Sequence, residues 1–327
     1  MPVLLVTYRQ RESGHPYLPD LLRSEQAGFG PDQPLWLVSW GFDVPRLLRT
    51  LKGRNVAYHA HSTGYGFDLP PGIPVLAVSR NTLGYWADRN PRNPIFYIPN
   101  ALASHWIDRG ARRENKMNLD IIDGNHQRRP IDVLVQQRKT SDYVLNQLVP
   151  ALRAKGYRVE VQTGWVHDLV DLFNSSTIYI YDSADYWRAR GLSEGFGLPP
   201  LEALACGCVV FTSFNHALSD NLDPGILAHQ IGFGSLEADL DRIESAVNDP
   251  EVWAAHPDAL RALLAITSQN SLLNRWRLAL KEIDQHWTRT NSASTPLRTK
   301  PCWQIRLLNR VNLLKERFLR ILGQSLC

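Results

Sequence analysis

One stretch of the sequence decides the fold, and it reads SEGFGLPPLEALACGCVV over residues 193–210. It follows an apolar strand pattern that ends at Tyr181, and it contains a glycine turn, a helical pattern and a second apolar run. Pro199 and Pro200 fit the first helical positions, where a missing N–H costs nothing. Gly207 is placed to end the helix in a left-handed conformation. The stretch therefore predicts a strand, a loop, a helix and a second strand of an α/β sheet.

The glycine turn of this stretch predicts an anion-binding site. Gly195 and Gly197 let the backbone approach a ligand closely, and the free N–H groups of the helix start favour a negative charge. Open α/β sheets bind ligands at the carboxyl ends of their strands, which is where the turn lies. Glu194 and Glu202 flank it, and this suits a diphosphate with a sugar on one side and a ribose on the other. The alternative is a proline-capped amphipathic helix with two solvated glutamates.

Apolar runs rich in Val, Ile and Tyr alternate with helical patterns along the first two thirds of the chain. Strands are predicted at residues 3–7, 35–39, 55–59, 75–79, 95–98, 133–135, 158–162, 177–181 and 209–212. Helical patterns lie at residues 44–51, 81–88, 143–154 and 199–206. This alternation predicts the α/β class, with parallel sheets and crossover helices.

The length of 327 residues suits two domains, each with its own core. A polar segment with weak periodicity separates two series of strands and helices, and a second polar stretch, rich in Thr, Ser and Pro, precedes the last helical pattern. We expect an N-terminal domain at residues 1–105, a linker at 106–130, a C-terminal domain at 131–290, and a linker with a final helix at 291–327.

Composition and charge exclude several classes of protein. The hydrophobic content of 44% and the charged content of 21% are those of a globular protein. The net charge is +4, but residues 298–327 carry seven basic residues against one glutamate, so the body of the chain is close to neutral. A nucleic-acid-binding enzyme more often carries a basic stripe across its body, and we therefore expect no nucleic-acid partner.

The cysteines and the N-terminus favour a cytoplasmic location. Only four cysteines occur, and they match neither a structural zinc site nor a disulfide framework, so reduced thiols and no metal are expected. The first residues lack the basic region and the cleavage site of a signal peptide. No apolar run approaches the roughly 20 residues of a membrane span.

The stretch at residues 193–210 resembles the E-x7-E motif of retaining GT-B glycosyltransferases, especially glycosyltransferase family four. The resemblance implies the GT-B fold, in which two Rossmann-like domains with parallel sheets face a cleft. It implies that Glu194 contacts the donor sugar as a catalytic residue and that Glu202 binds the ribose hydroxyls. It implies that Gly195, Phe196 and Gly197 bind the phosphates of the donor and that Leu198 also contacts the donor.

Other segments resemble the same family in the expected order, and the resemblance extends from about residue 36 to residue 287. Gly164 and Trp165 match the strand–loop–helix segment that borders the nucleotide base. Residues 97–101 match the segment that closes the N-terminal domain, and residues 215–220 match the loop after the motif strand.

A pair of basic residues, Arg138 and Lys139, follows the strand predicted at residues 133–135. Enzymes of this type use no metal, and a basic pair neutralises the charge that grows on the departing diphosphate. The family usually has Gly-Arg directly after the strand and a Lys several residues later, whereas here Gln136 and Gln137 come first. Lys139 matches the family Lys better than Arg138 matches the family Arg. The alternative is a basic helix start exposed to water.

His61 resembles the histidine with which the family faces the donor sugar, and it fits better than His59. The alternative is a structural or merely exposed loop histidine. Two departures from the family affect the acceptor side. The loop after the first predicted strand, at residues 8–14, has a single glycine, and the N-terminal domain is short. We therefore expect acceptor recognition to be unusual.

The tail predicts an amphipathic helix at residues 302–322, with apolar residues on one side and arginines mostly on the other. Such a helix suits an anionic membrane surface, which would place the protein at the inner face of the membrane. The alternative is a C-terminal helix that docks on the surface of the protein itself.

The resemblance implies a retaining, metal-independent hexosyl- or related glycosyltransferase, which moves a sugar from a nucleotide diphosphate sugar to an unidentified glycan, lipid-linked or other acceptor. The nucleotide sugar is a co-substrate, and no further cofactor is expected. One alternative is a catalytically degenerate GT-B protein that acts as a nucleotide-sugar-binding or scaffold subunit. Another is a sugar-nucleotide epimerase or hydrolase on the same fold, which would require a general base that the sequence does not supply.

Overall fold

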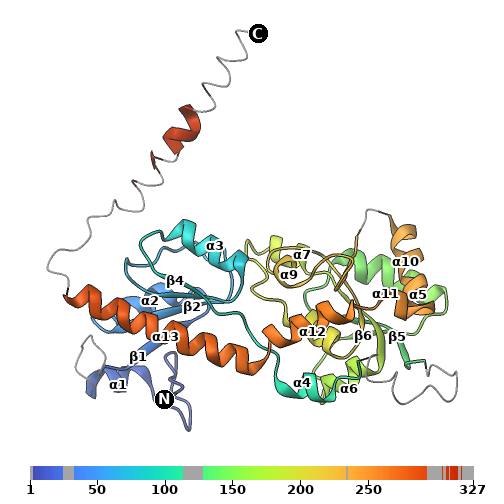
Figure 1. Ribbon diagram of the computed structural model, residues 1–327, viewed down its shortest axis with the longest axis horizontal. Coiled ribbons are helices and arrows are strands. Elements are labelled where there is room, and N and C mark those ends of the chain that lie inside the picture. The colour runs from blue at the N-terminus through green and yellow to red at the C-terminus, as the bar shows by residue number, and fades with distance from the viewer. Residues whose placement is uncertain are drawn as a thin grey trace.

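The computed structural model describes residues 3–24, 33–112, 128–232 and 235–292, together with positions 304, 307, 308, 310–315 and 318. It contains two parallel β-sheets that lie side by side, each flanked by helices (Figure 1). The first sheet has the order β1 (Leu35–Ser39), β2 (Asn55–Ala60), β3 (Val75–Ala77) and β4 (Ile95–Tyr97). The second has the order β6 (Val159–Gln162), β5 (Ile131–Gln136), β7 (Ser176–Tyr181), β8 (Val209–Thr212) and β9 (His229–Gln230). The predicted α/β class is confirmed, and every strand predicted beyond residue 34 overlaps an observed strand.

The strand predicted at residues 3–7 is wrong. Val3, Leu4 and Leu5 are 88%, 64% and 67% exposed and join neither sheet. The chain instead folds back on itself, because the N–H of Thr7 bonds to the carbonyl of Pro16 at 3.0 Å. The segment thus satisfies its backbone locally, and β1 stays at the edge of the first sheet.

The core of the first domain lies between its sheet and three short helices. They are α1 (Leu18–Ser24), α2 (Val44–Thr50) and α3 (Arg80–Arg89). The helix α3 begins where the Ser79 side chain accepts a hydrogen bond from the N–H of Thr82. Its Trp86 is fully buried and meets Tyr58 of β2 edge to face at 5.1 Å. Burial of this ring pair fixes α3 on the sheet.

The second sheet is covered by helices on both faces. The helices of this domain are α5 (Val149–Ala154), α6 (Leu169–Asn174), α7 (Ala184–Arg188), α8 (Leu198–Ala205), α9 (Leu218–Asn221), α10 (Leu236–Asn248), α11 (Pro250–Trp253) and α12 (Pro257–Ile266). All six residues of β7 are buried, as expected for a central parallel strand. The helix predicted at residues 143–154 begins with a π-helical turn, Val144–Leu148, since Pro150 cannot donate to the carbonyl four residues before it.

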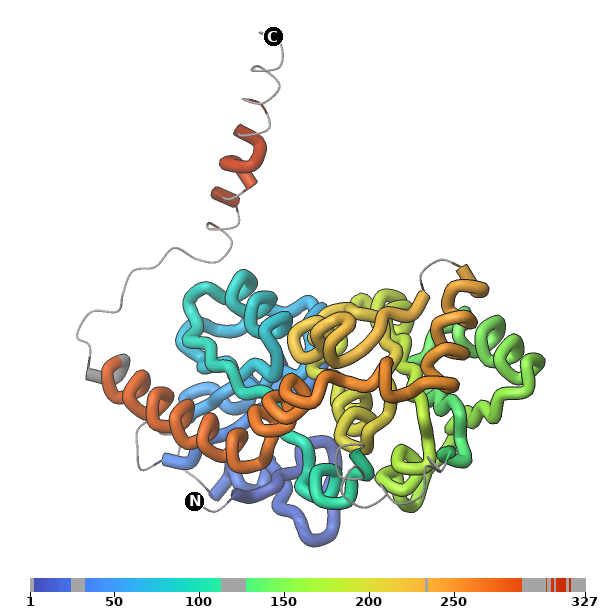
Figure 2. The backbone as a smooth tube through the Cα atoms, turned by 45° about the vertical axis from the view of Figure 1, so that its right-hand side comes forward, coloured from blue at the N-terminus to red at the C-terminus, as the bar shows by residue number. Residues whose placement is uncertain are grey.

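Two helices connect the domains. The short α4 (Ser104–Arg109) lies at the start of the expected linker, and its Trp106 packs against Phe173 of α6 at 5.6 Å. The long α13 (Gln269–Ser292) crosses from the second domain back to the first, as Figures 1 and 2 both show. There Ala279 and Ile283 are buried in one cluster with residues of β2 and β3. The helix α13 therefore covers a face of the first sheet.

The helix predicted at residues 302–322 lies largely outside the described residues. The positions described there are helical, and their apolar side chains are exposed, with Leu314 and Phe318 at 64% and 63%. None of the helices in the described part of the chain is long and apolar enough to cross a bilayer.

Candidate functional site

The strand order of the second sheet indicates where a ligand can bind. The chain enters the sheet at β5, continues to β6 on one side and then crosses to β7 on the other. Neighbouring parallel strands whose connections leave in opposite directions open a crevice at their carboxyl ends, and ligands bind there. The strand β5 ends at Gln136, two residues before Arg138, and β7 ends at Tyr181. The basic pair and the loop that carries Glu194 therefore meet at this crevice.

Glu194 is held in the crevice by three groups from different segments. Its Oε2 accepts hydrogen bonds from the Tyr181 hydroxyl at 2.7 Å and from Nε1 of Trp187 at 2.8 Å. Its Oε1 lies 3.7 Å from Nζ of Lys139. The residue is only 5% exposed. The alternative of a solvated glutamate at this position is therefore wrong, since this carboxylate is desolvated, oriented and paired with a cation.

The two residues of the basic pair point in different directions. Nζ of Lys139 lies 4.6 Å from the centre of the Trp187 ring as well as beside Glu194, so the ammonium is bound by a carboxylate and an aromatic face. Lys139 has a φ of 70°, in the left-handed region that residues other than glycine rarely adopt. Arg138 is exposed and makes no ion pair within the part of the chain that the structure describes. Lys139 thus lies at the site, and Arg138 lies outside the Glu194 cluster.

The glycine turn brings the two domains into contact. A Cβ on Gly195 would lie 1.6 Å from the backbone carbonyl oxygen of His61, a distance that no side chain can occupy. Gly197 has a φ of 85° and lies directly before α8, which begins with Leu198. Phe196 is 3% exposed, and its side chain packs in the hydrophobic core of the second domain. The sequence assigned both glycines to ligand approach, whereas the structure shows that Gly195 is also needed for domain contact.

Hydrogen bonds beside Glu194 join the first domain to the second. The Ser62 hydroxyl donates to the carbonyl of Ser193 at 2.7 Å, and the N–H of Thr63 donates to the Ser193 hydroxyl at 3.2 Å. The N–H of Asn81 donates to the carboxylate of Asp220 at 3.0 Å. Sequence reasoning did not identify these contacts between the domains, because serine, threonine and asparagine carry no pattern that distinguishes a domain contact from a turn or a helix start.

Glu202 lies in α8 and lines a small cavity of about 40 Å³. Its lining consists of Leu134, Gln136, Gln162, Leu169, Leu172, Phe173, Tyr179, Pro199 and Glu202. Glu202 is only partly exposed, and its burial raises the pKa of the carboxyl to about 7. Gln162 donates to the carbonyl of Gly164, and Trp165 next to it is 84% exposed. The structure thus brings Glu202 and the loop after β6 to one place.

The raised pKa of Glu202 predicts a pH-dependent stability. Below pH 4.5 the carboxyl is protonated in both states, and as pH rises through about 7 the folded protein must bury a charge. Glu202 therefore lowers the free energy of unfolding by on the order of 3 kcal/mol between these limits. We expect Glu202→Gln to melt several degrees above the wild type at pH 8 and within a degree of it at pH 4.5, without ligand. An equal difference at both pH values would contradict this account.

His61 lies between two rings at the carboxyl end of β2. The Trp40 ring stacks on it at 4.9 Å with an interplanar angle of 13°, and the His59 ring lies 4.1 Å away. Burial lowers the pKa of His61 to about 4, so its imidazole is neutral near pH 7. It can donate or accept a hydrogen bond there, but it does not supply a positive charge.

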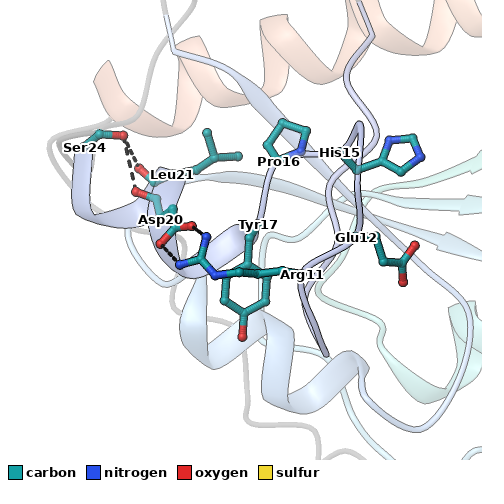
Figure 3. Close-up of a pocket in the computed structure, with 8 residues that line it drawn as sticks. All are labelled: Arg11, Glu12, His15, Pro16, Tyr17, Asp20, Leu21 and Ser24. Carbon is teal, nitrogen blue, oxygen red and sulfur yellow. Dashed lines mark hydrogen bonds and ion pairs between the residues drawn. The ribbon is translucent and has the colours of Figure 1, made fainter.

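A larger open cavity of about 500 Å³ lies elsewhere, between the first loop and α1 (Figure 3). It is lined by Arg11, Glu12, His15, Pro16, Tyr17, Asp20, Leu21 and Ser24. Arg11 lies over the Tyr17 ring and pairs with Asp20, so these charges neutralise one another. None of the predicted site residues lines this cavity.

Comparison with known proteins gives one family and several related folds. Residues 153–254 match the family model for glycosyl transferases group 1. A glycosyltransferase from Rickettsia africae ESF-5 is similar with a TM-score of 0.54 and 14% identity over 76% of each chain. Sucrose-phosphate synthase from Thermosynechococcus elongatus is similar with a TM-score of 0.53 and 15% identity, over 80% of this chain and 74% of that chain. No curated protein matches the sequence.

A third solved structure is the pneumococcal O-GlcNAc transferase GtfA in complex with UDP and GlcNAc. Its TM-score is 0.50 at 12% identity, over 76% of this chain and 56% of that chain. The identities are low, so these likenesses bear on the fold alone. Together with the two parallel Rossmann-like sheets and the crossing helix α13, they show that this chain has the GT-B fold and that part of its second domain matches the glycosyl transferases group 1.

Proposed function

We propose that this protein is a retaining glycosyltransferase, which moves a sugar from a nucleotide diphosphate sugar to a glycan or lipid-linked acceptor. The observation that carries the proposal is the placement of Glu194, Lys139 and Glu202 around the start of α8, where the strand order of the second sheet reverses. The match of residues 153–254 to the glycosyl transferases group 1 supports it.

The donor would lie across the start of α8. In this arrangement the backbone of the glycine turn and the first N–H groups of α8 bind the diphosphate. Glu202 accepts hydrogen bonds from the ribose hydroxyls, and Gly164 and Trp165 border the base. Glu194 faces the sugar, and Tyr181 and Trp187 hold it in place. The pneumococcal neighbour was solved with UDP and GlcNAc, so a UDP-sugar is the first donor to test.

The reaction would be an attack by the acceptor hydroxyl on the anomeric carbon, from the face on which the diphosphate leaves. The bond from carbon to the acceptor oxygen forms as the bond to the phosphate oxygen breaks, and the departing phosphate takes the hydroxyl proton. Lys139 would stabilise the negative charge on this phosphate without a metal. Arg138 would have to turn toward the site to add its own positive charge. Both oxygens of Glu194 are occupied by other groups, which favours this route over a covalent glycosyl-enzyme.

One observation favours a second candidate, a nucleotide-sugar-binding subunit without catalysis. Glu194 and Lys139 neutralise each other, and the first loop, at residues 8–17, is folded on itself. A protein of this kind would bind the donor but transfer nothing. Donor binding and donor turnover therefore have to be measured separately.

The test of the proposed function is a calorimetric screen of UDP-, GDP- and ADP-sugars. We expect one donor to bind the wild type at micromolar level, and we expect Glu202→Ala and the double variant Arg138→Ala/Lys139→Ala to weaken it at least tenfold. Glu282→Ala and Lys281→Ala, exposed on α13, are matched controls. Absence of binding by every donor would overturn the site assignment. Binding without hydrolysis or transfer would favour the subunit.

We also propose that the tail at residues 302–322 contacts an anionic membrane surface and so places the protein at the inner face of the membrane. Support comes from the exposed apolar side chains of Leu313, Leu314 and Phe318 in a basic part of the sequence. We expect the full chain to sediment with vesicles that contain phosphatidylserine and a variant that lacks residues 298–327 to stay in solution. Equal sedimentation of the two would refute the proposal.

A further inference from the structure

Two exposed aromatic residues follow β1 at its carboxyl end. Trp40 is 59% exposed and Phe42 is 72% exposed, with only Gly41 between them. Carboxyl ends of parallel strands face the ligand in open α/β sheets. Large aromatic side chains are usually buried, and binding sites are among the places where they are kept at the surface. Neither residue has a role in the donor site described above.

Trp40 is held in a backbone conformation that bulky residues rarely adopt. Its φ is 66°, in the left-handed region. The consequence of this conformation is that the indole lies flat on the His61 imidazole, at 4.9 Å and within 13° of parallel. One face of the indole is therefore supported by His61, and the residue as a whole remains 59% exposed. Backbone strain of this kind is concentrated at functional sites.

The rest of the turn is fixed by neighbouring residues. The Phe42 ring meets the Tyr65 ring edge to face at 5.1 Å. The next residue, Asp43, accepts a hydrogen bond from the Tyr8 hydroxyl at 2.8 Å and another from Nε of Arg9 at 3.0 Å. Tyr8 and Arg9 belong to the loop whose sequence departs from the family. This loop thus supports the two aromatic residues.

The aromatic pair is close to the proposed reaction centre. Trp40 stacks on the ring of His61, and the carbonyl of the same His61 touches Gly195, the residue after Glu194. The path from the indole to the sugar-facing carboxylate therefore runs through two intervening residues, His61 and Gly195. Glu202 lines a different cavity, together with Gln162 at the end of β6 and Leu169 at the start of α6. A second substrate on Trp40 would meet the sugar end of the donor and not its base.

We propose that Trp40 and Phe42 form an acceptor subsite that binds a pyranose ring by stacking, and this proposal rests on the proposed function. The C–H face of a pyranose is apolar and flat enough to lie on an indole, while its hydroxyls point sideways to polar groups. Such groups are present beside the turn in Arg9, whose side chain is 74% exposed, and in Asp43. An alkyl chain would instead require an enclosed apolar groove, which charged neighbours disfavour.

The test uses saturation-transfer NMR on the full chain with the methyl α- and β-pyranosides of glucose, galactose, mannose and N-acetylglucosamine, at millimolar concentration. We expect saturation transfer from the wild type to at least one of these sugars. The same sugar should shift the indole N–H signal of Trp40 in the protein spectrum, and that signal is assigned by its loss in Trp40→Phe. Trp40→Gly removes the ring and tolerates the positive φ, so it should fold while binding at least tenfold more weakly. Leu278→Ala, which removes another exposed apolar side chain on α13, should bind as the wild type does.

The subsite is refuted if no pyranoside binds, or if Trp40→Gly binds as well as the wild type. A shift of the Trp40 signal by short-chain alkyl detergent but by no pyranoside would also overturn it in favour of an apolar occupant. Donor calorimetry separates this failure from that of the proposed function. If a donor binds but no pyranoside affects Trp40, only the subsite is refuted. If no donor binds, the proposed function is refuted.

Discussion

Replacing Gly195 with alanine is expected to separate the two domains at the site and to lower sugar transfer more than a hundredfold. The new Cβ would lie 1.6 Å from the carbonyl oxygen of His61, and this atom belongs to the backbone and cannot rotate away. The loop has to move by more than an ångström, and it carries Glu194 with it. A displacement of about 1 Å at reacting groups can cost about a hundredfold in rate.

The same displacement breaks the hydrogen bonds that join the domains here. The N–H of Thr63 donates to the Ser193 hydroxyl at 3.2 Å, and the Ser62 hydroxyl donates to the Ser193 carbonyl. Hydrogen exchange at the amide of Thr63 should therefore become faster in Gly195→Ala, whatever the reaction is. This readout holds even if the protein proves to be a binding subunit.

Gly84→Ala is the matched control for this prediction. Gly84 lies within α3, and a Cβ there has nothing within 4 Å. Alanine favours a helix over glycine by about 1 kcal/mol, so this variant should be as active as the wild type and slightly more stable. Transfer by Gly195→Ala within fivefold of the wild type, with unchanged exchange at Thr63, would show that the two domains are not in contact in solution.

Much of the second domain could be predicted from local sequence. Parallel strands buried on both faces read as apolar runs, and prolines with a following glycine mark the two ends of a helix. For this reason the strand β8 was predicted at residues 209–212 and α8 to within one residue at each end, with Gly207 in the expected left-handed conformation. The α/β class with parallel sheets followed from these elements in this order, and the resemblance of residues 193–210 to a known motif added the GT-B fold.

Contacts between distant segments could not be predicted in the same way. The pattern at residues 3–7 is apolar enough for a strand, but whether it joins a sheet depends on how the next loop folds, and here that loop pairs with itself. Tyr181, in β7, and Trp187, in α7, donate hydrogen bonds to Glu194. The alternation of apolar and polar residues in these two elements does not indicate which side chains reach Glu194. The stack of Trp40 on His61 depends on a backbone angle that no residue pattern encodes.

Glu194→Gln is expected to lower transfer at least a hundredfold while leaving the protein folded, and comparison with Glu194→Ala shows why. Alanine leaves the Tyr181 hydroxyl, the Trp187 N–H and the Lys139 ammonium without the carboxylate that they share. Breaking a buried charged pair of this kind costs about 3–5 kcal/mol, so Glu194→Ala should melt far below the wild type. Glutamine also removes the charge that pairs with Lys139, but it still offers an oxygen to Tyr181 and Trp187, so its cost in stability should be smaller than that of alanine.

The two variants therefore separate a structural role of Glu194 from a catalytic one. If the glutamate only held Tyr181 and Trp187 in place, the glutamine variant would retain most of the activity, because it keeps those hydrogen bonds. If its charge acts on the sugar and on Lys139 as the transition state forms, both variants lose activity, because preorganised charges of this type contribute about 10²–10³ in rate. Melting curves with initial rates at saturating donor decide between these outcomes, and full activity in Glu194→Gln would remove Glu194 from the mechanism.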